Sequence, residues 1–150
     1  MKRFSFSTFQ VDELNQEALQ TCRAVAELQP VSPMPVLLLG DRGCGKTHLL
    51  YSIVNHVRAA SEVTGLACVT AREFPERVLQ IIKDPTPVER ARSAILLVDQ
   101  LESFSDKLDE LDAVVRIFLD HGHYVVIASN VHPARLKSLS TEFRALIEEG

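Results

Sequence analysis

One short segment restricts the fold of this chain more than any other feature of its sequence. Residues 40–47 read Gly-Asp-Arg-Gly-Cys-Gly-Lys-Thr, which matches the pattern G-x-x-x-x-G-K-[ST]. The segment follows a continuous apolar run at 36–39 and precedes apolar residues at helical spacing from Leu49 to Val57. A strand, a glycine-rich turn and a helix in this order form a cradle of backbone N–H groups for phosphate. The motif therefore predicts an α/β fold with a phosphate-binding loop.

The residue types in this loop predict how phosphate and a metal ion are held. Glycines let the backbone N–H groups turn inward around phosphate oxygens, and the next helix adds the positive end of its dipole. Lys46 supplies a positive charge to the β and γ phosphates, and the Thr47 hydroxyl is a ligand for Mg²⁺. We therefore predict that a nucleotide is bound by Gly40, Asp41, Arg42, Gly43, Cys44, Gly45, Lys46, Thr47 and His48.

Strands and helices alternate along the rest of the chain. After the strand at 36–39, apolar runs predict further buried strands at 66–69, 94–98 and 124–128. Apolar residues at helical spacing predict helices between these strands. Such alternation is typical of a parallel sheet with helices on both faces. We therefore predict an α/β, three-layer architecture with a parallel sheet of four or five strands.

Boundary signals locate one predicted helix, and helical spacing locates another. Thr70 and Glu73 stand three positions apart before an apolar helical pattern, which predicts a capping box at the start of one helix. Pro85 and Pro87 are expected to end this helix, because proline interrupts helical hydrogen bonding. The second helix is predicted at 108–119, where apolar residues recur with helical spacing.

Polar side chains follow two of the buried strands, at the sheet edge where ligands of parallel sheets bind. Asp99 follows 94–98, and we expect it to hold Mg²⁺ together with Thr47, directly or through water. Asn130 follows the last strand, and we expect it to orient the attacking water or contact the γ-phosphate. A cap or turn residue is the alternative interpretation of each. The predicted catalytic residues are Lys46, Asp99 and Asn130, and the predicted metal ligands are Thr47 and Asp99.

Gln100, the residue after Asp99, predicts slow hydrolysis of a bound nucleotide. Gln100 can hold a water molecule by hydrogen bonding, but an amide does not take a proton from water at neutral pH. Glu102 is the nearest other carboxylate, and we expect it to face solvent. Efficient hydrolysis is therefore not expected.

Several further segments match one family of nucleotide-binding proteins. Gly45–Leu49 reads Gly-Lys-Thr-His-Leu, Thr70–Phe74 follows the predicted second strand, and Leu97–Gln100 ends in Asp-Gln. These segments resemble the P-loop NTPases of AAA+ type, and within them the bacterial replication initiators of DnaA and Hda type, with helicase loaders and transposition helpers of DnaC and IstB type as near relatives. The N-terminal box of that clade, which passes near the adenine, is similar to Phe4, Phe6, Phe9, Asn15 and Ala18, and Asn130 matches its sensor 1 position.

The resemblance implies one AAA+ nucleotide-binding core over residues 1–150. This core comprises an N-terminal segment and helix (1–29), a proline-rich hinge (30–35) and an α/β body (36–150). It implies ATP or ADP with Mg²⁺ as cofactor, acting as a switch for protein partners of the replication machinery. We expect the helical lid and the DNA-binding domain of initiators to be absent from these residues.

Two positions depart from the family pattern. Gln100 stands where initiators have the second Walker B acid, and Leu146 stands where the family places its arginine finger. Losing a general base costs about 10²- to 10⁴-fold in rate, and a missing finger about 10³- to 10⁵-fold. Arg144 lies close in sequence to the finger position, but an arginine on an amphipathic helix is typically a solvated charge. The resemblance therefore implies slow or impaired hydrolysis.

Charge and composition restrict the partners. The formal net charge of -4 opposes broad attachment to nucleic acid, so we expect at most a weak, local contact with single-stranded DNA. No apolar run approaches the roughly 20 residues needed to span a bilayer and no secretory signal is evident, so we expect a cytoplasmic protein without a membrane contact. The three cysteines do not predict a disulfide or a zinc site. His121 and His123 bracket a glycine, and a metal site there is not expected.

Other functions remain open at the level of sequence. A helicase-loader or transposition-helper ATPase uses the same motifs, and a small-molecule kinase uses the same loop. A third alternative is an interaction module with a vestigial nucleotide site. If the strand at 36–39 lies at the edge of the sheet, its unpaired edge predicts self-association.

Overall fold

The structure is a computed structural model of the chain. It describes residues 16–29, 31, 34–40, 45–60, 65–69, 80–90, 93–104, 108–132, 135–136 and 140–149. Several predictions lie outside these residues: the box residues Phe4, Phe6, Phe9 and Asn15, the loop residues Asp41, Arg42, Gly43 and Cys44, and the segment Thr70–Phe74.

Four parallel strands form one sheet, as the alternation of apolar runs predicted. They are β1 (Val36–Leu39), β2 (Gly65–Val69), β3 (Ala94–Val98) and β4 (Tyr124–Ser129). Their spatial order is β1-β4-β3-β2, so the last of the described strands lies between β1 and β3. All three strand pairs are parallel, which places the carboxyl ends of the strands along one edge of the sheet.

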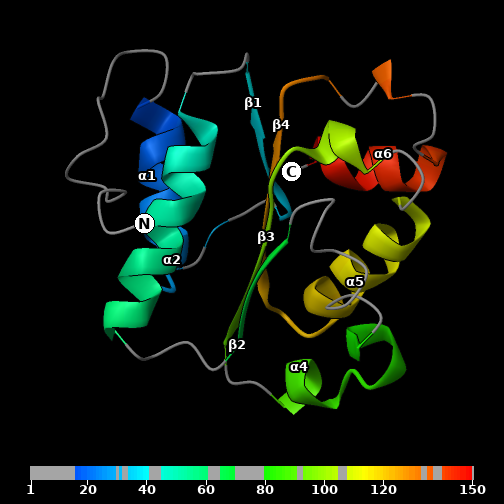
Figure 1. Ribbon diagram of the computed structural model, residues 1–150, viewed down its shortest axis with the longest axis horizontal. Helices are drawn as coiled ribbons and strands as arrows, with labels where there is room; N and C mark the ends of the chain where they lie inside the picture. Colours follow the sequence, from blue (N-terminus) through cyan, green and yellow to red (C-terminus); the bar gives the residue numbers. More distant parts are fainter. Residues whose placement is uncertain are drawn as a thin grey trace.

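Helices cover both faces of this sheet (Figure 1). Helices α1 (Gln16–Ala26) and α2 (Lys46–Ala60) lie on one face. Helices α5 (Leu108–Asp120) and α6 (Thr141–Glu149) lie on the other, together with the short α4 (Thr86–Arg90). The predicted three-layer α/β architecture is therefore confirmed.

Strand β3 shows why a continuous apolar run predicts a fully covered strand. Successive side chains of a strand point to opposite faces. Ile95 and Leu97 belong to the core on the α1–α2 side, whereas Leu96 and Val98 belong to the core on the α5–α6 side. All four side chains are fully buried, so an alternating polar position would have placed a polar group in one of the two cores.

The prediction that Pro87 ends a helix was wrong. The helical residues 80–83 end ahead of Pro85, as predicted, but Pro87 lies in the first turn of α4. Proline is well tolerated there, because the N–H that it lacks has no partner within the helix. The turn before α4 is held by Asp84, whose Oδ1 accepts a hydrogen bond from the Thr86 N–H at 3.2 Å.

His123 joins α4 to the sheet. Its ring is buried, Nδ1 accepts the N–H of Ala94 at 3.2 Å, and Nε2 donates to the carbonyl of Val88 at 2.7 Å. Because an acceptor and a donor are both needed, the ring is neutral with its proton on Nε2. His123 therefore has a structural role in which both ring nitrogens are used.

None of the described helices is both long and apolar enough to span a membrane.

Candidate nucleotide-binding site

The start of α2 carries the lysine of the glycine-rich motif. Gly45 has a φ of 98°, a left-handed conformation that side chains rarely adopt, so glycine suits the residue that leads into the helix. Lys46 is buried, and its Nζ donates to the carbonyl oxygen of Gly40 at 2.6 Å. The ammonium group therefore lies over the start of the loop, where the phosphate-binding function of the motif needs it.

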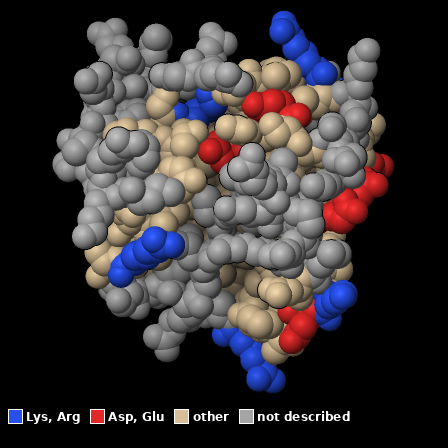
Figure 2. Space-filling view, viewed as in Figure 1, with Lys and Arg blue, Asp and Glu red and all other residues tan. Residues whose placement is uncertain are grey.

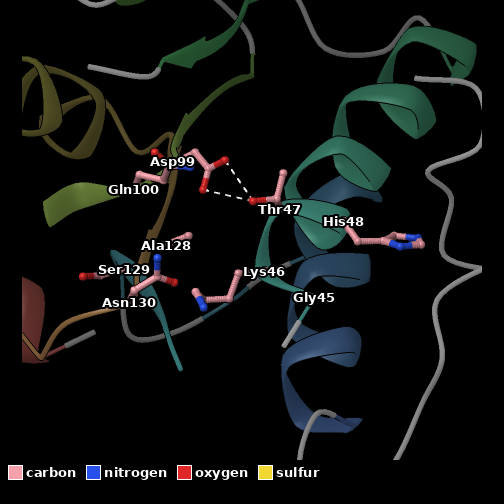
Figure 3. Close-up of a pocket in the computed structure, with 9 residues that line it drawn as sticks. All are labelled: Gly45, Lys46, Thr47, His48, Asp99, Gln100, Ala128, Ser129 and Asn130. Carbon is pink, nitrogen blue, oxygen red and sulfur yellow. Dashed lines mark hydrogen bonds between the residues drawn. The ribbon is translucent and has the colours of Figure 1, made fainter. Parts of the chain in front are cut away.

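Thr47 and Asp99 meet although they lie 52 residues apart in the chain. Thr47 follows β1 on α2 and Asp99 follows β3, on the two sides of β4. The Thr47 hydroxyl donates to Oδ2 of Asp99 at 3.1 Å, with Oδ1 at 3.4 Å (Figure 3). The predicted pair of metal ligands is therefore brought into contact by the sheet topology.

The environment of Asp99 opposes its ionisation. The side chain is buried, and this desolvation raises the pKa of the carboxyl group above its ordinary value of 3.8. Hydrogen bonds from Thr47 and from the backbone of Gln100 lower the pKa, Glu102 raises it, and Lys46 lowers it. A hydroxyl and a carboxylate are oxygen ligands of the kind Mg²⁺ prefers. Burial makes the negative charge of ionised Asp99 unfavourable, and a bound cation would stabilise that charge. The donor set therefore fits a magnesium ion.

Asn130 lies at the end of β4, next to the strand end that leads to Gly40. The β1–β4 register pairs Leu39 with Ser129, and the Gly40 N–H donates to the Ser129 carbonyl at 3.3 Å. The first residue of the loop and Asn130 therefore come directly after paired positions of adjacent strands.

The expectation that Glu102 faces solvent was wrong. One carboxylate oxygen of Glu102, Oε1, accepts the backbone N–H of Asn130 at 3.1 Å, and the other, Oε2, accepts the side-chain Nδ2 at 2.9 Å. The reason is the turn at Leu101–Ser103, a single 3₁₀ turn that follows a left-handed Gln100 with a φ of 56°. No spacing rule predicts this contact, because Glu102 and Asn130 lie 28 residues apart on different strand ends.

One pocket joins these residues (Figure 3). It has a volume of about 300 Å³, at the lower end of the range for small-molecule sites. Gln100, which is exposed, takes part in the lining, whereas Glu102 lies behind Asn130. Among the described residues, neither Arg144 nor Leu146 of α6 reaches this pocket. The lining residues are Gly45, Lys46, Thr47, His48, Asp99, Gln100, Ala128, Ser129 and Asn130.

The chain is similar along its whole length to bacterial initiators. The family of the bacterial DnaA ATPase domain matches residues 1–150. The chromosomal replication initiator protein DnaA of Desulfotalea psychrophila is 28% identical over 157 residues, covering 99% of this chain and 33% of that protein. The chain therefore spans about a third of the length of that relative.

Solved structures show the same fold. Domain III of the replication initiation protein DnaA from Thermotoga maritima has a TM-score of 0.80 at 25% identity, covering 100% of this chain and 65% of that one. The replication initiator DnaA bound to AMPPCP and single-stranded DNA has a TM-score of 0.78 at 22% identity, covering 100% of this chain and 49% of that one.

A structure of the DnaC helicase loader is more distant. Its TM-score is 0.57 at 16% identity, covering 86% of this chain and 77% of that one, which shows a shared fold alone. The parallel sheet and these similarities together establish the AAA+ P-loop NTPase fold. Because the family match covers all 150 residues, the chain belongs to the bacterial DnaA ATPase domain family.

Proposed function

We propose that the chain binds ATP with Mg²⁺ as a switch for protein partners of the replication machinery, and that it hydrolyses ATP slowly. The observation that carries this proposal is one pocket in which Lys46, Thr47 and Asp99 meet while position 100 offers an amide. The bound AMPPCP of the similar initiator supports an adenine nucleotide as the ligand. We also propose that residues 1–150 form a single nucleotide-binding core.

The residues would act as follows. Lys46 exchanges its bond to the Gly40 carbonyl for oxygens of the β and γ phosphates. Thr47 and Asp99 hold Mg²⁺, which when bound neutralises charge on those phosphates. Asn130 meets the terminal phosphate or the attacking water from the end of β4.

The side chain of Gln100, next to Asp99, limits the rate of ATP hydrolysis. Gln100 lines the pocket and can orient water, but its amide does not accept the proton of that water. A missing general base lowers the rate by about 10²- to 10⁴-fold. A switch with long-lived bound ATP follows from this.

The contact with single-stranded DNA is proposed to be weak. The similar initiator is bound to such DNA, but the net charge of this chain is -4. On the face in Figure 2, the lysine and arginine side chains of the described residues stand apart and form no continuous basic surface. Such a contact would therefore be local and sensitive to salt.

A nucleotide titration tests the central claim. We expect calorimetry to show binding of ATP and ADP with Mg²⁺, and Lys46→Ala to abolish it, because the variant loses the charge that meets the phosphates. Lys83→Ala is the matched control, since Lys83 is exposed and away from the pocket lining. If wild-type protein binds neither nucleotide, the proposal is wrong and an interaction module remains. Phosphoryl transfer to a small acceptor would instead favour a kinase.

A further inference from the structure

Glu102 holds both nitrogen atoms of Asn130 with one carboxylate. The backbone N–H donates to Oε1 at 3.1 Å and the side-chain Nδ2 donates to Oε2 at 2.9 Å. The neighbouring Ser129 hydroxyl lies 3.4 Å from Oε1. Hydrogen bonds to a charged group are stronger than neutral ones, so this pair of contacts fixes the backbone and the side chain of Asn130 together.

The turn after β4 reinforces this placement. The Ser129 hydroxyl donates to the Val131 carbonyl at 2.6 Å and accepts the Val131 N–H at 3.1 Å. Ser129 is fully buried, which leaves its hydroxyl no water with which to exchange these bonds. Asn130 is therefore held between a closed turn and the Glu102 carboxylate.

The chemistry of the two groups allows one orientation of the amide. An ionised carboxylate only accepts hydrogen bonds, so the Asn130 nitrogen must face Glu102 and the amide oxygen must face away. Nδ2 carries two hydrogens, of which Glu102 takes one. Asn130 lines the pocket and Glu102 stands behind it. The oxygen and the second N–H are therefore the groups that Asn130 offers to a ligand.

We propose that Glu102 is a positioning residue that makes the pocket distinguish ATP from ADP, by presenting this edge of Asn130 to the terminal phosphate and its neighbouring water. The inference rests on the proposed nucleotide binding. A terminal phosphate oxygen accepts the free N–H, and a water molecule donates to the amide oxygen. ADP lacks the phosphate at this position, so the fixed edge favours ATP selectively.

Glu102→Asp is the decisive variant, because it keeps the negative charge and shortens the side chain by one methylene. We expect it to reduce the ratio of the ADP to the ATP dissociation constant by about tenfold, the effect of one hydrogen bond to a charged group. Glu110→Asp is the matched control, since Glu110 is exposed on α5. The melting temperature of each variant shows whether the fold is kept.

A double-mutant cycle with Asn130→Ala shows whether Glu102 acts through Asn130. In the Asn130→Ala background we expect Glu102→Asp to leave the ATP to ADP preference unchanged. If the shorter acid changes the preference equally in both backgrounds, Glu102 does not act through Asn130 and the inference is wrong. Should Glu102→Asp fail to fold, Glu102→Gln in the same cycle tests the same coupling.

A spectroscopic measurement needs no nucleotide. We expect the side-chain amide of Asn130, assigned by its loss in Asn130→Ala, to give two widely separated proton resonances that converge in Glu102→Asp. If this signature is present but no nucleotide binds, the contact stands and the proposed function fails. If nucleotide binds and the cycle shows no coupling, the proposed function stands and this inference fails.

Discussion

Two adjacent residues of the pocket are held in arrangements that cost folding free energy. Asp99 is a buried carboxyl group whose pKa is raised by desolvation, and Gln100 has a left-handed backbone that non-glycine residues seldom adopt. Strain and buried charge of this kind persist where the surrounding structure enforces them, and they concentrate at functional sites. Both residues also line the pocket, Asp99 beside Thr47 and Gln100 next to it.

Restoring an acid beside Asp99 tests whether one side chain limits turnover. We expect Gln100→Asp to raise the ATP hydrolysis rate at least about tenfold, because a carboxylate can take the proton of the attacking water. The dissociation constant for ATP is expected to change much less. Steady-state phosphate release measures the rate, and Gln100→Asn is the control that keeps an amide. Equal rates for the two variants would show that the missing base is not limiting.

The Cys22 thiol carries a pH dependence that can be worked out from burial. It is fully buried in α1, and desolvation raises the pKa of the thiol from 9.0 to about 12. The unfolded chain releases this proton first as pH rises, so the contribution to the free energy of unfolding is constant below pH 9.0 and falls between 9.0 and about 12. Urea unfolding at pH 8 to 11 should show a smaller alkaline loss in Cys22→Ala than in wild type. An identical loss in both would contradict the expectation.

At the scale of elements, the strands were predictable and one helix was not. Apolar runs located β1 and β3 with their observed bounds, because a strand covered on both faces leaves no polar position. Helix α4 was missed because Pro87 is equally consistent with the end of one helix and the first turn of the next. Lys46, Thr47, Asp99 and Asn130, which line one pocket, were predicted from local motifs. The Glu102–Asn130 contact depends instead on how two distant strand ends are placed.

His123 provides a test of how α4 is attached. His123→Ala would leave the Ala94 N–H and the Val88 carbonyl without their partners in a buried site. Each unsatisfied buried group costs about 1–3 kcal/mol, so with two such groups we expect the free energy of unfolding to fall by about 2–6 kcal/mol. Urea denaturation measures this loss. His121→Ala is the control, because His121 is exposed beside it, and an equal loss in the two variants would contradict the role of His123.

At the scale of the whole molecule, the sheet has a protected centre and a less protected edge. The residues of β3 are fully buried, whereas β1 pairs only with β4 among the described strands and ends at Leu39, which is 45% exposed. The family resemblance read from the sequence is confirmed over the whole chain. Cytoplasmic localisation and self-association stay predictions.

Amide hydrogen exchange should show the difference between the buried centre of the sheet and its β1 edge. We expect the amides of β3 and the middle of β4 to exchange only on global unfolding, and those of β1 to exchange faster through local opening. Exchange followed by mass spectrometry at peptide level resolves these strands. Uniform protection of β1 and β3 would indicate that the outer edge of β1 is covered, as a self-associated form would require.

The position of β4 between β1 and β3 has a consequence for synthesis. Among the described strands β4 leaves the ribosome last, yet it joins β1, which leads into the loop, to β3, which Asp99 follows. Until it inserts, β1 has no neighbour among the described strands, and Thr47 and Asp99 have no common sheet to bring them together. A nascent chain therefore acquires its nucleotide pocket only when β4 has paired with β1 and β3, so nucleotide binding reports that this long-range pairing has formed.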